Sequence, residues 1–397
     1  MNHSRRLLLL AAFAVLALAI AGCSGGGAQP TSAPATSAPA PATSAAAPAT
    51  SAPSAGGTDL TALAAAAKQE GQLTVIALPH DWCGYGDLIS GFKTKYGLTV
   101  NELNPDGSSA QEIEAIKANK DNKGPQAPDV IDMGFSFGKS SKDEGLLAPY
   151  KVSTWNDIPD SIKDADGYWY GDYYGVLAFE VNSDVAKTLP QDWSDLLKPD
   201  YKSQVALSGD PRQSTQAILS VYAAALANGG SLDNVQPGLD YFAKLNKEGN
   251  LVPVISTNAL VAKGETPVRL TWDYNALAHR DQVKGNPKID VVIPKSGQIG
   301  GVYVQAISAF APHPNAAKLW MEYLYSDEGQ IGWLKGYCHP ARYQAMQKAN
   351  KVPSDVAAKL PPADNIVLPS LDQLNKAQDV ITKNWNSVVG ADIKAAP

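Results

Sequence analysis

The chain has 397 residues, of which 44% are hydrophobic and 18% are charged, and its formal net charge at pH 7 is −6. This acidic balance argues against a nucleic-acid partner, because binding to a phosphate backbone needs a basic surface. The length and composition fit a large globular unit that buries its core in two lobes.

The first 22 residues have the pattern of an export signal. Arg5 and Arg6 precede an unbroken apolar run at 7–20, and small residues then lead into Cys23. The run is shorter than the roughly 20 residues that cross a bilayer, so we do not expect a transmembrane helix. Small residues directly before a cysteine favour cleavage there and acylation of its thiol, and the segment 1–22 resembles a bacterial lipoprotein signal. An ordinary signal peptide with an incidental cysteine is the alternative.

The segment that follows the cysteine is unusual in composition. Residues 24–58 are Ala, Pro, Ser, Thr and Gly with Gln29 as the single larger side chain, and they carry no charge. Such a segment buries too little apolar surface to offset its conformational entropy. We therefore expect 23–58 to form a disordered tether between a lipid-anchored Cys23 and the folded part.

Helix-like and strand-like segments alternate from residue 59 onward. An α/β order of this kind predicts a parallel sheet with helices on both faces, and ligands bind such sheets at the carboxyl ends of the strands. The expected elements of the first half are a helix at 59–70, strands at 73–78, 98–103 and 128–133, and helices at 87–96 and 108–120. Those of the second half are strands at 204–207, 268–271 and 289–293, helices at 214–228, 239–246 and 315–324, and extended segments at 174–182 and 301–308.

Five stretches in a fixed order carry a family resemblance. They are 66–75, 167–171, 181–184 with 193–202, 209–211 with Ser214, and 315–324 with 326–330. These stretches resemble the signature segments of type II periplasmic solute-binding proteins of ABC importers, near the spermidine/putrescine, iron and phosphonate groups.

The resemblance implies an α/β fold of two lobes. Each lobe would be a mixed, mainly parallel sheet flanked by helices, and two crossover strands would join them. Lobe one would hold 59–177 plus 305–397, and lobe two would hold 178–304. The implied role is that of a monomeric, lipid-anchored protein on the extracytoplasmic side of the membrane. It would capture a small solute between the lobes and deliver it to the ABC permease subunits, without catalysis, cofactor or metal.

Polar and aromatic side chains at the predicted strand ends are the candidate ligand residues. Carboxylates interleaved with aromatic rings favour an organic cation, and a polyamine fits best, because rings attract ammonium groups and carboxylates pair with them. The candidates are Asp81, Trp82, Tyr85 and Ser136 in lobe one, Tyr174 at the first crossover, and Asp210, Trp272, Asp273 and Tyr274 in lobe two.

Other ligands and a different protein class stay open. Arg212 and the helix terminus at Ser214 would instead hold a phosphonate or another small anion, and Asp210 has an alternative role as a cap of that helix. An extracellular lipoprotein hydrolase is the rival class, with Ser208 as its nucleophile and His80-Asp81 or Asp210 as partners.

The pair Tyr173-Tyr174 resembles the paired tyrosines of ferric-iron binders. In that group the pair belongs to the second lobe, whereas this pair precedes the first crossover. We therefore do not expect iron.

One of the three cysteines is the predicted acylation site, and the other two could form a disulfide. With Cys23 acylated, Cys83 and Cys338 remain, and a pair of thiols outside the cytoplasm favours a disulfide. Two separate buried thiols are the alternative. The resemblance places both residues in lobe one, where a bond between them would fix the loop of Asp81 and Trp82.

Overall fold

The computed structural model describes residues 59–360 and 366–395, so the predicted signal and tether lie outside it. Its first elements are α1 (Leu60–Glu70), β1 (Gln72–Ile76), α2 (Tyr85–Tyr96), β2 (Thr99–Leu103), α3 (Ser109–Ala118), β3 (Val130–Gly134), α4 (Ser136–Asp143), β4 (Leu147–Ala148) and β5 (Tyr170–Asn182). The middle of the chain forms β6 (Val205–Leu207), α5 (Thr215–Ala227), α6 (Gln236–Lys247), β7 (Leu251–Ile255), α7 (Asn258–Lys263), β8 (Val268–Trp272), α8 (Asp273–Val283) and β9 (Ile289–Val292). The last elements are β10 (Gly300–Ser308), α9 (Pro314–Leu324), α10 (Asp327–Lys335), β11 (His339–Pro340), α11 (Tyr343–Lys348), α12 (Ser354–Ala357) and α13 (Leu371–Val388). Among these described helices, none is long and apolar enough to cross a membrane.

Local sequence signals set several of these boundaries. The Asp59 side chain accepts hydrogen bonds from the backbone N–H groups of Thr61 and Ala62 and so begins α1, and Gly71 ends it in a left-handed conformation. Ser214 caps α5 in the same way through the N–H of Ala217. The predicted elements therefore appear within a few residues of their expected positions.

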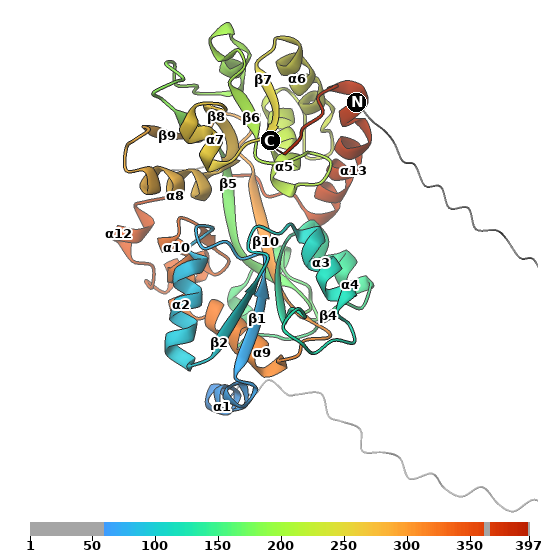
Figure 1. The fold of residues 1–397 in the computed structure, drawn as a ribbon, viewed down its shortest axis with the longest axis vertical. Helices are drawn as coiled ribbons and strands as arrows, with labels where there is room; N and C mark the ends of the chain where they lie inside the picture. Colours follow the sequence, from blue (N-terminus) through green and yellow to red (C-terminus); the bar gives the residue numbers. More distant parts are fainter. Residues whose placement is uncertain (1–58, 361–365, 396–397) are drawn as a thin grey trace, which may run out of the picture. The chain divides into compact units, whose positions relative to one another are not determined.

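Two long strands connect the two halves of the structure. The larger sheet has the order β3-β10-β5-β8-β6-β7, with β4 on β10 and with β9 and β11 on β5, whereas β1 and β2 form a separate parallel pair. The first part of β5 pairs with β10 and its last part, from Leu177 onward, pairs with β8 and β9. These pairings and that of β10 with β3 are antiparallel, so among the described strands the expected parallel pairing is found only for β1 with β2 and for β6 with β7 and β8. Figure 1 shows β5 and β10 running between a lower group that contains α1–α4 and α9 and an upper group that contains α5–α8.

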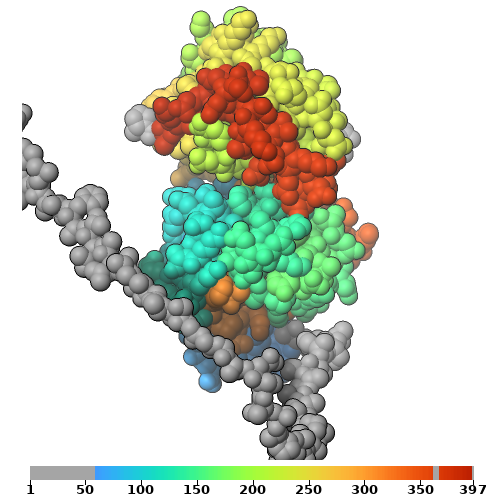
Figure 2. Space-filling view, turned by 90° about the vertical axis from the view of Figure 1, so that its right-hand side faces the viewer, coloured from blue at the N-terminus to red at the C-terminus, as the bar shows by residue number. Residues whose placement is uncertain are grey.

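The C-terminal helix α13 packs with the upper group. Its buried stripe of Leu374, Ala377, Ile381 and Trp385 faces α5 and α6, and the Trp385 ring lies 5.7 Å from that of Phe242. Figure 2 shows α13, in red, across the yellow elements of this group. This differs from the predicted division, which assigned everything after residue 305 to lobe one. The stripe reveals that α13 needs an apolar partner but does not reveal which one. We therefore propose the predicted two lobes with α13 moved to lobe two.

Cys83 and Cys338 are joined by a disulfide. Their Cα atoms are 5.4 Å apart, within the range that the bond requires. The backbones of the two segments touch, because a Cβ atom built on Gly336 would overlap the backbone of Cys83 and Gly84. Glycine at position 336 thus allows the close approach that the disulfide needs.

We predict that Gly336→Ala destabilises the protein by about 1–3 kcal/mol or more, because the added methyl group has no space. Thermal unfolding and titration of free thiols would measure the loss of stability and of the disulfide. Gly71→Ala is the control: its φ is +75° and nothing lies within 4 Å of the added carbon, so only backbone strain of about 1 kcal/mol should appear. Equal stability of Gly336→Ala and the wild type would contradict the packing described here.

Candidate ligand-binding site

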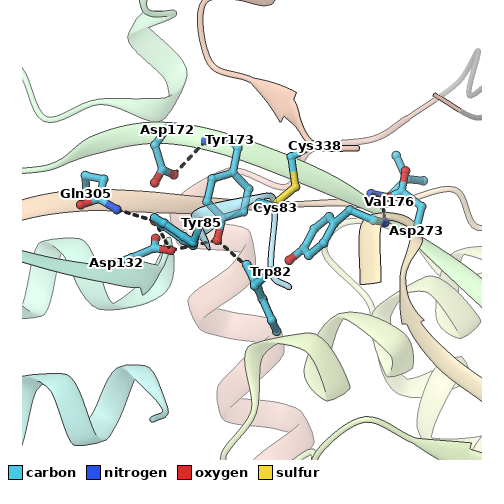
Figure 3. Close-up of a disulfide and its surroundings, with 11 residues drawn as sticks. Trp82, Cys83, Tyr85, Asp132, Asp172, Tyr173, Val176, Asp273, Gln305 and Cys338 are labelled. Atoms are coloured by element: carbon cyan, nitrogen blue, oxygen red, sulfur yellow. Dashed lines mark hydrogen bonds between the residues drawn. A yellow bond between two sulfur atoms is a disulfide. The ribbon is translucent and has the colours of Figure 1, made fainter. Parts of the chain in front are cut away.

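Aromatic rings from both groups of elements meet near the carboxyl ends of β1 and β8. The Trp82 ring, in the loop before α2, lies 5.4 Å from Tyr274 at the start of α8 and 5.7 Å from Tyr303 on β10, both edge-on. Its Nε1 donates a hydrogen bond to Tyr173 Oη at 2.7 Å, as Figure 3 shows. Trp82 is half-buried whereas Tyr274 is fully buried. The rings therefore form one aromatic cluster that spans the two halves.

Two glycines make room for this cluster. A Cβ on Gly175 of β5 would overlap the Tyr274 ring, and one on Gly301 of β10 would overlap the Trp272 ring. Side chains at these positions would push the aromatic rings off the strands. The glycines explain how large rings pack directly on the two connecting strands.

A network of buried polar groups lies beside the rings. Asp132 Oδ2 on β3 accepts hydrogen bonds from Tyr85 Oη at 2.7 Å and from Tyr173 Oη at 2.9 Å. Gln305 Nε2 donates to Tyr85 Oη at 2.6 Å, and the backbone N–H of Asp132 donates to Glu112 Oε2 at 2.8 Å. Figure 3 shows Asp132 and Gln305 around Tyr85. Tyr173 thus connects this network to Trp82.

Burial makes ionisation of the acids in this network unfavourable. Desolvation raises the pKa of Asp132 to about 7, although the hydrogen bonds from Tyr85 and Tyr173 act in the opposite direction. Burial, with the charge of Asp132, raises the pKa of both Glu112 and Asp172 well above the usual range. In the part of the chain that the structure describes, no Lys, Arg or His side chain is hydrogen-bonded to these three carboxyl groups or forms an ion pair with them. Neutral, protonated carboxyls are therefore favoured near pH 7.

A fourth buried acid, Asp273, lies at the other end of the aromatic cluster. Its Oδ1 accepts hydrogen bonds from the N–H groups of Val176 and Tyr274, both at 2.9 Å, and it begins α8. Burial raises its pKa to about 7. Asp273 thereby fixes α8 to β5 through one oxygen.

Several polar atoms of this region have no hydrogen-bond partner among the described residues. Such atoms are costly to bury, so they mark places where a donor or acceptor from outside fits. They include Asp132 Oδ1, Asp172 Oδ2, Asp273 Oδ2, Gln305 Oε1 and Tyr274 Oη.

The structure brings six of the nine predicted ligand residues together. Tyr174 joins them at the edge, where its ring stacks on His339 at 4.8 Å and the nearby Asp273 contributes to raising its pKa to about 12, after the larger effect of burial. The six are Trp82, Tyr85, Tyr174, Trp272, Asp273 and Tyr274.

The other three predicted residues lie in different surroundings. Asp81 is exposed, and Ser136 lines a groove of about 290 Å³ between α4 and α13. Asp210 is paired with Arg212, whose Nε lies 2.8 Å from Oδ1 and whose Nη2 also contacts Asp392 at 3.0 Å.

The residues of the hydrolase alternative have separate partners. Ser208 Oγ donates to the backbone carbonyl of Leu270 at 2.8 Å, and the exposed His80 contacts Glu102 at 2.6 Å. No pair of nucleophile and base forms between Ser208 and His80. Within 59–360 and 366–395, no group of three or more His, Cys, Asp or Glu residues has an arrangement that would hold a metal ion.

The sequence-based prediction missed the central acids. Asp132 lies in the apolar run 130–134 and Asp172 lies among aromatic residues at the start of β5. A charged residue inside an otherwise apolar strand is the signal that would have revealed both. Glu112 and Gln305 give a weaker signal, since helices and strands often carry such residues on their exposed faces.

Two groups of α/β elements are joined by two long strands, and buried acceptors and aromatic rings lie where the groups meet. This arrangement defines a two-lobed solute-binding protein. The chain belongs to the bacterial extracellular solute-binding protein family, whose profile matches residues 126–367. The family and the importer class expected from the five motifs are thus confirmed.

Individual proteins show the same relationship. A Salmonella typhimurium periplasmic protein, provisionally named for binding 2-aminoethylphosphonate, is 28% identical over 284 residues, which is 68% of this chain and 78% of that protein. The spermidine/putrescine-binding periplasmic protein of Escherichia coli is 30% identical over 176 residues, 42% of this chain and 48% of that protein. The fructose-6-phosphate-bound periplasmic binding protein AfuA of Actinobacillus pleuropneumoniae has a TM-score of 0.62 at 21% identity, covering 81% of this chain and 99% of that one.

These comparisons confirm the type II periplasmic-binding-protein fold and the coarse function. The chain is an extracytoplasmic solute-binding protein of an ABC importer, which binds a small solute and interacts with a permease. The family consists of transport proteins rather than enzymes.

We predict that Asp132→Asn changes how stability depends on pH. A folded-state pKa of about 7, raised from 3.8, means that the stabilisation from this group is present below pH 4 and is lost as pH rises through 7. The loss amounts to roughly 4 kcal/mol for this one carboxyl. Asparagine keeps the oxygen that accepts from the tyrosines and does not ionise. The free energy of unfolding of the variant, relative to that of the wild type, should therefore be higher at pH 8 than at pH 4.5.

Urea unfolding at both pH values would measure this gain. Asp106→Asn, at an exposed carboxyl in the loop after β2, is the control and should follow the wild type. Identical pH dependence in Asp132→Asn and the wild type would show that Asp132 titrates normally.

Proposed function

We propose that the protein captures a small organic cation, with a linear polyamine as the best-fitting class, and delivers it to the permease. The observation that carries this proposal is the set of buried carboxyl groups of Asp132, Asp172 and Asp273, which form no ion pair with any described Lys, Arg or His residue and each leave one oxygen without a donor. Carboxylates without basic partners accept hydrogen bonds from an ammonium group, and the nearby aromatic rings of Trp82 and Tyr274 attract positive charge.

The named relatives support an amino group as the common feature. Spermidine, putrescine and 2-aminoethylphosphonate, which appear in the relatives' names, each carry at least one primary amine. An amine beside these acids would meet oxygens that have no cationic partner within the described residues.

A phosphonate or other small anion is the second candidate. The Salmonella relative, aligned over 68% of this chain, favours it. Arg212 is the residue predicted to hold such a ligand. Its positive charge is already neutralised, however, by ion pairs with both Asp210 and Asp392. A ligand that carries both an amine and a phosphonate fits the acids better than a simple anion does.

Thermal unfolding of the purified protein with a panel of solutes tests the proposal. Putrescine or spermidine at 100 times its dissociation constant should add about 2.7 kcal/mol of stability. Methylphosphonate, which lacks an amine, should have no effect. A response to methylphosphonate but to none of the amines would overturn the cation proposal in favour of the second candidate.

Asp273→Asn should weaken binding of the stabilising amine by about 30-fold or more, because a charge pair in a buried site is lost. Asparagine retains the oxygen that accepts from Val176 and Tyr274, so α8 should stay in place. Calorimetry would measure both affinities. Asp240→Asn, at an exposed carboxyl of α6, should bind as the wild type does. Unchanged affinity in Asp273→Asn would remove this carboxyl from the site.

We also propose that Cys23 is acylated and anchors a monomer to the membrane through the tether 23–58. Small residues before Cys23 and the uncharged tether support this. Cys23→Ala should move the protein from the membrane fraction to the soluble extracytoplasmic fraction, as immunoblots of fractionated cells would show. Retention of Cys23→Ala in the membrane would contradict lipid anchoring.

A further inference from the structure

We propose that capture of an organic cation expels a proton from the buried cluster of Glu112, Asp132 and Asp172, so that affinity for the solute falls as the medium becomes acidic. The inference rests on the proposed function, because only a positively charged solute replaces the proton. It concerns a coupling between binding and protonation. A cation site can exist without such a coupling.

The three carboxyl groups come from three elements and share one buried volume. Glu112 on α3, Asp132 on β3 and Asp172 on β5 are exposed by only 1%, 5% and 0%. Glu112 accepts the backbone N–H of Asp132 at 2.8 Å, and Asp172 accepts that of Tyr173 at 2.8 Å. Neither contact supplies positive charge.

The groups that face the cluster from the surrounding elements are neutral. The titratable ones are tyrosines, and each has its pKa raised by burial and by the nearby acids. They are Tyr85 on α2, Tyr173 on β5, Tyr274 on α8, Tyr303 on β10 and Tyr325 after α9. The amide of Gln305 on β10 completes the surroundings.

Like charges so close together in a dry environment do not all ionise. Burial raises the pKa of Asp132 to about 7, and burial with the charge of Asp132 raises the pKa values of Glu112 and Asp172 well above their usual range. Without a ligand, the cluster therefore holds protons over the range in which free carboxyl groups are ionised.

A chain of hydrogen bonds links the cluster to the aromatic contact between the lobes. Trp82 Nε1 donates to Tyr173 Oη, which donates to Asp132 Oδ2. Asp132 and Asp172 share a hydrogen bond when one of them is protonated. Once that proton leaves, Asp132 Oδ1 has no partner within the described residues, and the fully buried, uncharged Gln305 Oε1 has none either. These two acceptors are where an ammonium group would donate its hydrogens.

The charges balance when the ammonium group takes the place of the proton. The Asp132 carboxylic acid and R–NH₃⁺ give an Asp132 carboxylate paired with R–NH₃⁺, and one H⁺ passes to water. The buried site is neutral before and after the exchange. Binding therefore avoids the cost of leaving an uncompensated charge in the protein interior.

Calorimetry of the full chain with putrescine tests the coupling. At pH 6, the observed binding enthalpy should vary with the ionisation enthalpy of the buffer by an amount that corresponds to at least one proton released. The dissociation constant should rise about tenfold when the pH falls from 6 to 5, as expected for a group that must lose one proton before binding.

Two variants assign the proton. Asp132→Asn should release about one proton fewer than the wild type on binding at pH 6. The proton that Asp273 releases, because its pKa is also raised, should be the same in both proteins. Tyr85→Phe removes a hydrogen bond that favours the charged form of Asp132, so the pH profile of affinity should move to higher pH. A merely structural role of Tyr85 would lower affinity at all pH values without moving the profile. Asp106→Asn is the control and should match the wild type.

The outcomes separate this inference from the proposed function. Tight binding of putrescine with no dependence on buffer or pH would overturn the proton coupling and leave the cation proposal intact. An equal proton count in Asp132→Asn and the wild type would also overturn it. No binding of putrescine or spermidine even at pH 8 would overturn both.

Discussion

The long strand β5 is the constraint on which the candidate site depends. Near its start, β5 supplies Asp172 to the acid cluster and Tyr173, whose hydroxyl donates to Asp132 of that cluster. Further along β5, the N–H of Val176 holds Asp273 at the start of α8. Because β5 is hydrogen-bonded to neighbouring strands along its length, its register cannot slip without turning these side chains to the other face. One strand therefore sets the spacing between residues that come from both groups of elements.

The loop of Trp82 is tied to the same strand by two routes. Trp82 donates directly to Tyr173, and the disulfide from Cys83 leads to Cys338, which is followed at once by β11. In β11, His339 pairs with Tyr174 of β5. The Trp82 side of the aromatic contact is therefore tied to β5, as the Tyr274 side is through Asp273 and Val176.

Much of the site was predictable because its residues follow strand ends, where sequence patterns are clear. The triplet Trp272, Asp273 and Tyr274 ends β8 and begins α8, as the apolar run before it indicates. Asp132 was missed because β3 is buried on both faces. The sequence pattern of such a strand does not show which of its side chains meets an acid from another strand. The position of α13 was not predictable for a similar reason: an apolar stripe specifies burial but not the surface that covers it. Tertiary contacts between distant segments decided both cases.

The same strand carries a buried acid that is compensated in the ordinary way, and the contrast bears on function. Glu180, eight residues after Asp172, is fully buried but forms ion pairs with Arg269 and His279. Arg269 is held in turn by Asn258, at 2.7 Å. Burying an acid without a partner is costly, and at Glu180 the fold supplies protein cations to meet that cost. Asp172, on the same strand, and Asp132, on β3, are similarly buried but have no such cations among the described residues. At Glu180 the protein's own cations therefore compensate the buried charge, whereas at Asp132 and Asp172 a bound proton or a cation from outside has to do so.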